Sequence, residues 1–463
     1  MTTVPPLTGA RGPTGRRGRT SRAQPRKADA FDLMKLLARI DLDLCFGFAM
    51  FLPMVFILQL GMKGAAAFVL ATVGYAALRW REVHKMVLPR LILFVPAGLA
   101  CFSMIWSEMP TETLKQGLEL AGTIFAAVLI ASARRPDMAL RGMALAFLIY
   151  VVVSLAAGGT VTVGSTGVAF SGLGKSKNLV ADIAATGLII TLGAAWLAAR
   201  SRNWLWALGL GAATVLEIMV VMQARSAGAT LGLAVGLGVL FALAALSVLP
   251  KVMRVLLGAV LAMGIVSIGV FYRAISTALA EATIALFDKD PTLTGRTYLW
   301  DRAFDLIREK PLVGLGFQAF WHQGNAEAEG LWRYAGITSR QGFNFHNTFV
   351  ELLVHLGWIG LVLIVAVLLI SVFAFAVKFV RKPTPLLCVW GALLMYELVR
   401  MPIETIGFYP FYFSTVLMFG ALAMGLEPRE KKGPQLAPAI YRYTMAGRQQ
   451  GSNVGENPAP AQR

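Results

Sequence analysis

Long apolar stretches, separated by short polar segments, recur along the chain from residue 42 to residue 426. Most of them are about 17 to 22 residues long, and a helix of about 20 residues crosses a hydrocarbon core of roughly 30 Å. This pattern predicts an all-α integral membrane protein, a bundle of about 12 transmembrane helices with one large external loop. The predicted spans lie at 42–60, 64–79, 91–106, 114–133, 139–157, 178–199, 204–223, 229–249, 255–272, 352–377, 386–400 and 411–426.

Basic residues gather in every second loop. If the N-terminus is cytoplasmic, all loops on the cytoplasmic side are basic, whereas the opposite loops carry fewer basic residues. Lys and Arg are enriched in cytoplasmic loops, so both termini are predicted to be cytoplasmic. The basic loops contain Arg79-Trp80-Arg81 with Lys85, Arg134-Arg135, Arg200 with Arg202, Lys251 with Arg254, and Lys378 with Arg381-Lys382.

The chain divides into five predicted parts. Residues 1–40 and 427–463 are polar and basic, and are predicted to be disordered cytoplasmic tails. Transmembrane helices 1–9 are expected within 41–272, and helices 10–12 within 347–426. The connection between them, 273–346, is much longer than the others, and this topology places it outside.

The external loop is predicted to contain an ordered helix. Apolar residues recur in it at spacings of three and four, as in an amphipathic helix that lies along a membrane surface. Arg296 begins this predicted helix, and Pro311 ends it. The predicted apolar face consists of Leu299, Ala303, Phe304 and Ile307.

Composition and charge argue against a soluble enzyme and against a nucleic-acid-binding protein. The chain is 57% hydrophobic and 15% charged, with a mean hydropathy of +0.65, whereas about a quarter of the residues in soluble domains are charged. The net charge of +18 comes from basic residues that separate the apolar stretches and form no continuous face, so no nucleic-acid partner is predicted. Cys45, Cys101 and Cys388 lie singly in separate spans and are interpreted as core residues.

Two motifs at the end of the external loop resemble a known family. His346-Asn347 is followed, after nine residues, by Gly357-Trp358-Ile359-Gly360-Leu361. Upstream, Thr294-Gly295-Arg296 leads to Pro311-Leu312-Val313-Gly314-Leu315-Gly316. These motifs are similar to the signature of the O-antigen ligase and Wzy-type polysaccharide polymerase superfamily, and the arrangement of many spans with one late external loop resembles it too.

The resemblance implies a glycosyltransferase of the bacterial inner membrane whose active site faces the periplasm. Such enzymes take an oligosaccharide from undecaprenyl pyrophosphate and transfer it to a sugar hydroxyl. The implied partners are this lipid-linked oligosaccharide, membrane lipids, and flippase and chain-length regulator proteins. We expect a polymerase of exopolysaccharide or O-antigen repeat units. The alternative is an O-antigen ligase, which uses the same donor but transfers to lipid A-core.

A lipid-linked oligosaccharide flippase or transporter is a more remote alternative. A transporter should line a path across the bilayer with polar residues or broken helices near the midplane. In this sequence the polar residues gather on one side of the predicted membrane.

Three residues are predicted to be catalytic. Fixed cations stabilise the charge of a departing pyrophosphate, and an arginine can hold phosphate oxygens through two parallel hydrogen bonds. Arg296 and Arg225 lie on the predicted external side, where the family carries arginines. His346 is the candidate general base for the acceptor hydroxyl because imidazole titrates near neutral pH, although it could instead only orient the acceptor or the phosphate. Each of the three could instead be an ordinary interfacial side chain.

Six further residues are candidate substrate-binding groups. Two of them resemble the Lys-Asn pair of some exopolysaccharide polymerases and favour a polymerase, although lysines that extend to the interface explain them equally well. For the charged residues at the end of a late span, a structural ion pair is the alternative. The six candidates are Lys177, Asn178, Asn344, Asn347, Arg400 and Glu404.

No metal or cofactor is predicted. Two Asp-x-Asp triplets occur, but Asp41-Leu42-Asp43 lies on the cytoplasmic side, and Asp288-Lys289-Asp290 lies outside the matching motifs. Asp182 and Glu217 fall inside predicted spans, where ionisable residues are functional candidates by default, and neither has a partner that the sequence identifies. His355, one turn inside its span, is expected to pack in the interior.

Overall fold

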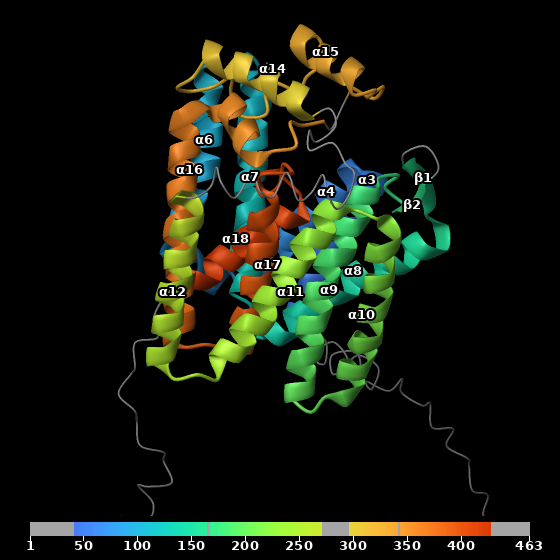
Figure 1. Cartoon of the computed structure of the whole chain (residues 1–463), viewed down its shortest axis with the longest axis vertical. Coiled ribbons are helices and arrows are strands. Elements are labelled where there is room, and N and C mark those ends of the chain that lie inside the picture. The colour runs from blue at the N-terminus through green and yellow to red at the C-terminus, as the bar shows by residue number, and fades with distance from the viewer. Residues whose placement is uncertain (1–40, 164–166, 271–295, 341–342, 427–463) are drawn as a thin grey trace, which may run out of the picture. The chain divides into compact units, whose positions relative to one another are not determined.

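The computed structural model describes residues 41–163, 167–270, 296–340 and 343–426 (Figure 1). Both predicted tails and the Asp288-Lys289-Asp290 triplet lie outside these residues. The chain divides into two compact units, Met1–Leu42 and Asp43–Arg463. Only Asp41 and Leu42 of the first unit are described, so everything below concerns the second.

Helices occupy the positions of all the predicted spans. Among the described residues, seven helical segments are long and apolar enough to cross a membrane, by length and composition. This agrees with an all-α membrane protein, while the count of twelve spans stays a prediction. The helices are α2 (Leu42–Val55), α3 (Ile57–Leu60), α4 (Met62–Leu78), α5 (Trp80–Val87), η1 (Leu88–Phe94), α6 (Val95–Phe102), η2 (Ser103–Ile105), α7 (Pro110–Ala131), α8 (Pro136–Ala157), α9 (Lys177–Arg200), α10 (Trp204–Ala224), α11 (Ala227–Ser247), α12 (Lys251–Val270), α14 (Arg296–Glu309), α15 (Ala326–Tyr334), α16 (Thr348–Arg381), α17 (Pro385–Arg400) and α18 (Phe413–Gly425).

The structure also contains a small sheet that the sequence analysis did not predict. Strands β1 (Gly159–Val163) and β2 (Gly167–Gly172) pair antiparallel between α8 and α9. β1 alternates Thr and Val, β-branched residues that favour strands, and glycines lie at the start of both strands. A second difference from the prediction is the segment Trp80–Val87, which forms the helix α5, whereas the sequence analysis expected a loop there.

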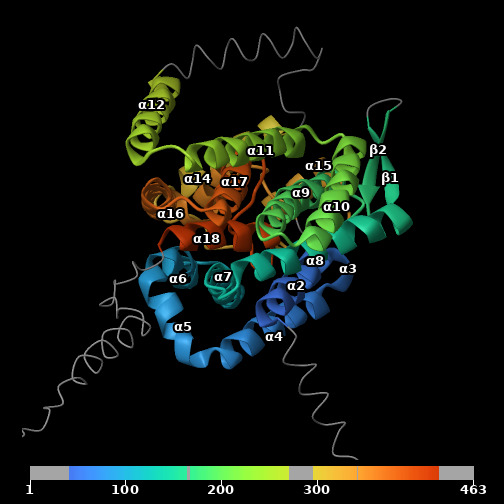
Figure 2. The same ribbon diagram turned by 90° about the horizontal axis from the view of Figure 1, so that it is seen from below.

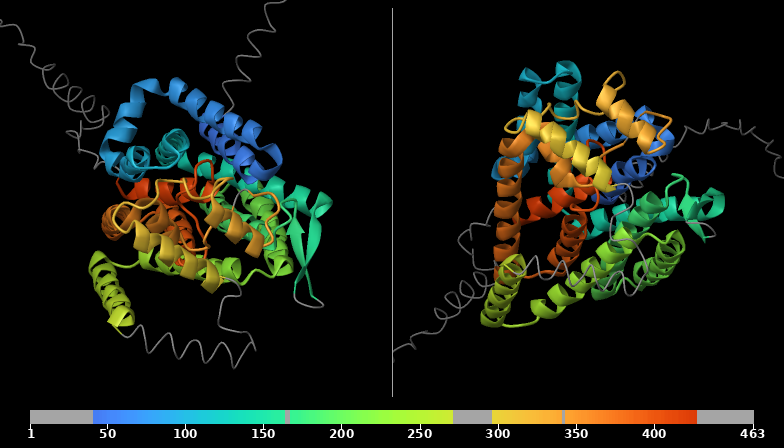
Figure 3. Two further views of the ribbon diagram at one scale, coloured as in Figure 1. Left: turned by 90° about the horizontal axis from the view of Figure 1, so that it is seen from above. Right: turned by 45° about the horizontal axis from the view of Figure 1, so that its top comes forward.

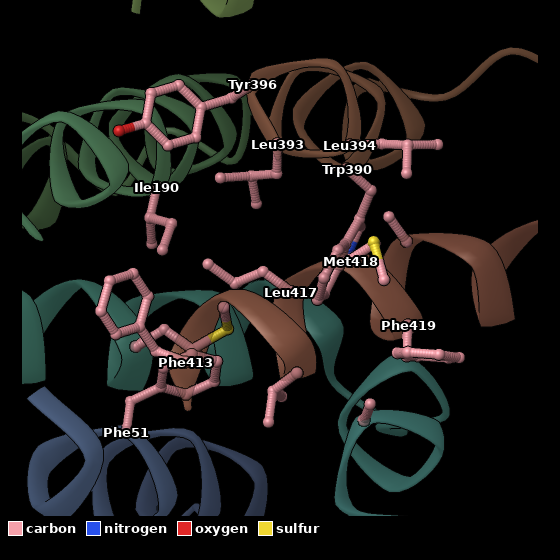
Figure 4. Close-up of a cluster of buried hydrophobic side chains, with 14 of the residues drawn as sticks. Phe51, Ile190, Trp390, Leu393, Leu394, Tyr396, Phe413, Leu417, Met418 and Phe419 are labelled. Carbon is pink, nitrogen blue, oxygen red and sulfur yellow. The ribbon is translucent and has the colours of Figure 1, made fainter. Parts of the chain in front are cut away.

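Small residues allow the helices to approach one another closely. α11 lies alongside α17, and α9 alongside α10 (Figure 2). A Cβ on Gly420 of α18 would lie 2.9 Å from the ring of Trp390 on α17, and a Cβ on Gly193 of α9 would lie 2.6 Å from Val389. Around these contacts Phe51, Ile190, Leu393, Phe413 and Leu417 fill the interior (Figure 4).

α16 is broken at Gly357, which has a left-handed φ of 62°. The break frees backbone groups on both sides, and the segment from Pro311 to Gly316 pairs with them. The N–H groups of Leu315 and Gly316 donate to the carbonyls of Val354 and His355, each at 2.9 Å, and the N–H groups of Trp358 and Ile359 donate to Pro311 and Leu312 at 2.9 and 3.1 Å. A Cβ on Gly357 would lie 2.4 Å from the Leu312 carbonyl, so only glycine fits there. The two motifs of the family signature therefore bind one another.

The predicted loop helix is confirmed as α14, which begins at Arg296. With α15 it lies across the ends of the long helices (Figure 3). Leu299, Ala303 and Ile307 are buried against Trp332 and neighbouring apolar residues. Phe304, predicted on the same face, is 42% exposed, because it lies on the edge of the apolar stripe.

Candidate functional site

The start of α16 and the loop between α17 and α18 are held together by Thr348. The N–H of this buried residue donates to the carbonyl of Met401 (2.8 Å), and its hydroxyl donates to the carbonyl of Glu404 (2.9 Å). The same hydroxyl accepts a hydrogen bond from the N–H of Ile406 (3.0 Å). The residues just before α16 therefore face the 401–412 loop in a fixed arrangement.

His346 precedes α16 in a left-handed backbone conformation, with a φ of 51°. The side-chain oxygen of Asn344 accepts a hydrogen bond from the His346 N–H (2.8 Å), as asparagines commonly do in turns. The imidazole Nδ1 lies 3.2 Å from Oε2 of Glu404. An ionised carboxylate can only accept, so Nδ1 is the nitrogen that donates here, and in a neutral imidazole Nε2 would then have the lone pair that can take a proton from another group.

Glu404 connects His346 with Arg296. Its Oε1 lies 3.0 Å from Nη2 of Arg296, whose Nη1 donates to the carbonyl of Ile403. Burial raises the pKa of Glu404, but the hydrogen bond from His346 and the nearby positive charges, Arg296 among them, outweigh it and hold this pKa below its ordinary value. Glu404 is therefore ionised at neutral pH and joins the predicted base to one predicted cation.

A cavity of about 560 Å³ lies beside His346 and Glu404. His346 and Glu404 line it, whereas Arg296 is not among its lining residues and reaches it through Glu404. Three other predicted site residues, Asn178, Asn344 and Arg400, also line the cavity.

Arg400 is engaged in a buried ion pair at the cavity wall. Its Nη1 lies 2.5 Å from Oδ1 of Asp182, which also accepts a hydrogen bond from the Tyr396 hydroxyl (2.7 Å). Glu397 lies further away, at 4.0 Å. The sequence left a structural ion pair open for Arg400 but could not identify Asp182 as its partner, because the two residues are 218 positions apart. Both residues line the cavity, so the pair also shapes the predicted site.

Arg225 lies in a different place from the other predicted catalytic residues. It follows α10 with a left-handed φ of 48°, is exposed, and lines a separate groove of about 390 Å³ with Thr160 and Phe170 of the β-hairpin. Its neighbour Ser226 donates to the side chain of Asn178 (3.0 Å), which lines the cavity of His346. The structure therefore does not bring Arg225 into that cavity.

Two predicted binding residues lie at helix starts and do not line the cavity. Asn347 caps α16, since its side-chain oxygen accepts from the N–H groups of Phe349 (2.9 Å) and Val350 (3.2 Å). Lys177 is the first residue of α9, behind the cap residue Ser176, and does not line the cavity.

Glu351 is a buried carboxylate below the cavity that the sequence analysis did not single out. It accepts hydrogen bonds from the Trp321 indole (2.9 Å) and from the N–H of Phe345 (2.8 Å), next to His346. A glutamate directly before a predicted apolar span was the signal available in the sequence. His355 is buried, as expected, with Nε2 3.5 Å from Glu351. Glu217 is also buried and accepts from the Thr191 hydroxyl (3.0 Å).

The described residues offer no obvious metal site. Among them, no group of three or more His, Cys, Asp or Glu side chains could hold a metal ion. Asp43 of the first Asp-x-Asp triplet accepts hydrogen bonds from the Tyr75 hydroxyl and the Arg135 N–H. Cys388 is buried, as expected of a core residue, but the other two cysteines are only half-buried.

Comparisons with known proteins agree with the motifs. A family model described as O-antigen ligase matches residues 188–365, a range that contains Arg225, Arg296 and His346 but ends before Glu404. The exopolysaccharide production protein ExoQ of Rhizobium meliloti (strain 1021) is 28% identical over 385 residues, covering 79% of this chain and 85% of that protein. The resemblance of this chain to the O-antigen ligase and Wzy-type polysaccharide polymerase superfamily, predicted from its motifs, is thereby confirmed.

Proposed function

We propose that this chain is a membrane glycosyltransferase that moves an oligosaccharide from undecaprenyl pyrophosphate to a sugar hydroxyl on the periplasmic face, and so joins repeat units of an exopolysaccharide or O-antigen. The observation that supports this most strongly is the contact of Glu404 with both His346 and Arg296 beside a cavity. A base, the carboxylate that orients it and a cation lie within one hydrogen-bonded unit.

In the proposed reaction, Nε2 of His346 takes the proton from the acceptor hydroxyl as its oxygen attacks the anomeric carbon of the donor sugar. The bond from that carbon to the pyrophosphate oxygen breaks, and the pyrophosphate leaves with the electron pair. Glu404 keeps Nδ1 protonated and stabilises the imidazolium that forms, as the carboxylate does in other base–carboxylate pairs.

Arg296 is proposed to stabilise the charge on the departing pyrophosphate. A guanidinium has five N–H donors, and the described contacts of Arg296 use one on Nη1 and one on Nη2. The remaining donors have no partner among the described residues and can bind phosphate oxygens in the proposed complex. A cation already fixed in place stabilises developing charge without reorganisation.

The acceptor distinguishes the two enzymes that fit this site. Similarity to an exopolysaccharide production protein favours a polymerase, whereas the family model described as O-antigen ligase favours transfer to lipid A-core. A deletion strain separates them: loss of long polymer supports the polymerase, and loss of polymer attached to lipid A supports the ligase. Unchanged surface polysaccharide in that strain would contradict both.

We also propose that the cavity faces the periplasm of a bacterial inner membrane, with flippase and chain-length regulator proteins as partners. Reporter fusions at Arg135, Arg202 and Lys382 should then be cytoplasmic, and a fusion at Gly324 should be periplasmic. A cytoplasmic signal at Gly324 would place the cavity on the wrong side for a flipped donor.

The proposed transfer needs no divalent cation, because Arg296 supplies positive charge beside the base. Purified enzyme should therefore keep its activity in excess EDTA. Loss of activity on chelation, with recovery in Mn²⁺ or Mg²⁺, would show that a metal takes part.

A further inference from the structure

Two aromatic rings form a corner of the cavity beside His346. Trp321 and Phe343 both line the cavity, and their rings meet at 85° with centroids 5.3 Å apart. Phe343 also packs edge-on against the His346 imidazole, with centroids 5.7 Å apart. An apolar corner therefore adjoins the proposed base.

The Trp321 ring is fixed from behind. Its indole N–H donates to the buried Glu351 carboxylate at 2.9 Å, and Phe345 packs against it with centroids 4.9 Å apart. The only polar atom of this side chain is thus occupied outside the cavity, and what the indole offers to the cavity is apolar surface. A ring held in one position in advance loses little conformational entropy when a ligand binds.

The polar groups beside this corner match sugar hydroxyls. Gln318 and Asn344 line the same cavity, and their amides can both donate and accept hydrogen bonds. A pyranose ring has hydroxyls around its edge and C–H groups on its faces, and these C–H groups pack favourably on the electron-rich face of an aromatic ring.

The cavity lining suits a phosphate poorly. Among the described residues, Arg400 is the one arginine that lines the cavity, and it is paired with Asp182 at 2.5 Å, while Glu404 adds a further carboxylate to the lining. A phosphate at this corner would meet the apolar rings, and the same cavity contains these negative charges.

We propose that Trp321 and Phe343 form a binding subsite for the sugar ring that accepts the transferred oligosaccharide, and that they hold its hydroxyl at His346. This inference rests on the proposed function, because it takes His346 as the base. It adds the chemical class of the group that occupies the corner, a pyranose ring, and separates this subsite from the pyrophosphate.

The test uses full-length protein in nanodiscs and repeat-unit oligosaccharides released from the host's surface polysaccharide by partial hydrolysis. Trp321→Leu and Phe343→Leu remove an aromatic face but keep apolar bulk. Trp204→Leu is the control, since Trp204 is 60% exposed and does not line the cavity. Saturation-transfer NMR measures oligosaccharide binding, and transfer from the lipid-linked donor measures KM for each substrate.

We expect Trp321→Leu to weaken oligosaccharide binding and raise the acceptor KM about tenfold, with Phe343→Leu changing both by less. The donor KM should stay within about twofold of the wild-type value, and Trp204→Leu should behave as wild type. Trp321→Phe, which keeps a ring, should recover part of the acceptor affinity. A rise in the donor KM instead would assign the corner to the donor sugar and overturn the proposal.

The binding measurement separates this proposal from the proposed function. If wild-type protein transfers sugar and Trp321→Leu binds the oligosaccharide normally, the subsite is wrong while the function stands. If wild-type protein binds the oligosaccharide through Trp321 but transfers nothing, the subsite stands and the function is wrong. Wild-type protein that does not bind the oligosaccharide overturns the subsite.

Discussion

Arg296 and Arg225 were both predicted to stabilise the charge of the departing pyrophosphate, but the structure places them in two different environments. The Arg296 side chain is 20% exposed and has a carboxylate and a carbonyl as partners. Arg225 is exposed in its groove, and no hydrogen bond or ion pair of its side chain is found among the described residues. Arg296 is thus held next to the proposed base, His346, whereas Arg225 has no such partner among the described residues.

This difference suggests a division of roles. A fixed cation stabilises charge that develops during the reaction, so its loss should lower kcat. An exposed cation attracts an anionic lipid headgroup and must be ordered when the headgroup binds, so its loss should raise the donor KM. The predictions that follow test this division, from the largest expected effect to the smallest.

His346→Ala should reduce turnover about 10²- to 10⁴-fold, the usual contribution of a general base, and leave donor binding largely intact. Transfer from lipid-linked donor measures this, with immunoblots to confirm normal abundance in the membrane. His322→Ala is the matched control, because His322 is half-buried and does not line the cavity. Near-normal turnover in His346→Ala would remove this residue from the mechanism.

Arg296→Lys should lower kcat roughly 10- to 100-fold, because it keeps a charge but loses hydrogen bonds to charged groups worth about 1.5–3 kcal/mol. The donor KM should change little. Arg302→Lys, on the same helix and also in an ion pair with a glutamate, should leave both constants near their wild-type values. An equal fall in kcat in the two variants would indicate that the Arg296 ion pair serves only to keep α14 in place.

Arg225→Ala should raise the donor KM about two- to fivefold at low salt, in keeping with the 0.2–1 kcal/mol typical of exposed charges. The effect should shrink as ionic strength rises, because salt screens exposed charges. Arg202→Ala is the control, since Arg202 is also exposed with a left-handed φ, of 57°, but does not line the groove. A large, salt-independent fall in kcat would erase the proposed division.

The contacts of Glu404 should have a small effect on stability that depends on pH. Its pKa is lowered in the folded protein, so these contacts stabilise the fold above its unfolded pKa of about 4.3, and their contribution is lost as pH falls through the lower, folded value. In nanodiscs, the melting temperature of the wild-type protein should be higher than that of Glu404→Gln at pH 5 to 7. The difference between the two melting temperatures should disappear below about pH 4. If the difference in melting temperature grew as the pH fell, the contacts of Glu404 would not stabilise the fold through its ionised form.

Local patterns predicted the helices well. The apolar stretches gave the helix positions, and spacings of three and four gave α14, because both depend on neighbours in the sequence. The β-hairpin was missed although β1 alternates Thr and Val, because its strands are only five and six residues long and lie within a connection between apolar stretches. The same spacing rule also placed Phe304 on the buried face, although it lies on the edge of the apolar stripe and is exposed.

The site was predictable only as a set of residue types. The motif identified His346 and Arg296, but the carboxylate that joins them comes from a loop 58 positions after His346 and outside the matching motifs. The partner of Arg400 is further away still, and no spacing rule connects Asp182 to it. Chain topology brings these residues together, so their pairing could not be inferred from local sequence.

The broken helix α16 also bears on how the chain is assembled. A regular helix satisfies its own amide groups and can enter the bilayer before its neighbours arrive. α16 does not do so around Gly357, because the carbonyls of Val354 and His355 accept hydrogen bonds from Leu315 and Gly316 of the preceding segment. That segment precedes α16 and is therefore already synthesised when α16 leaves the ribosome. Insertion of this helix and docking of the loop before it are thus expected to occur as one cooperative step during biogenesis.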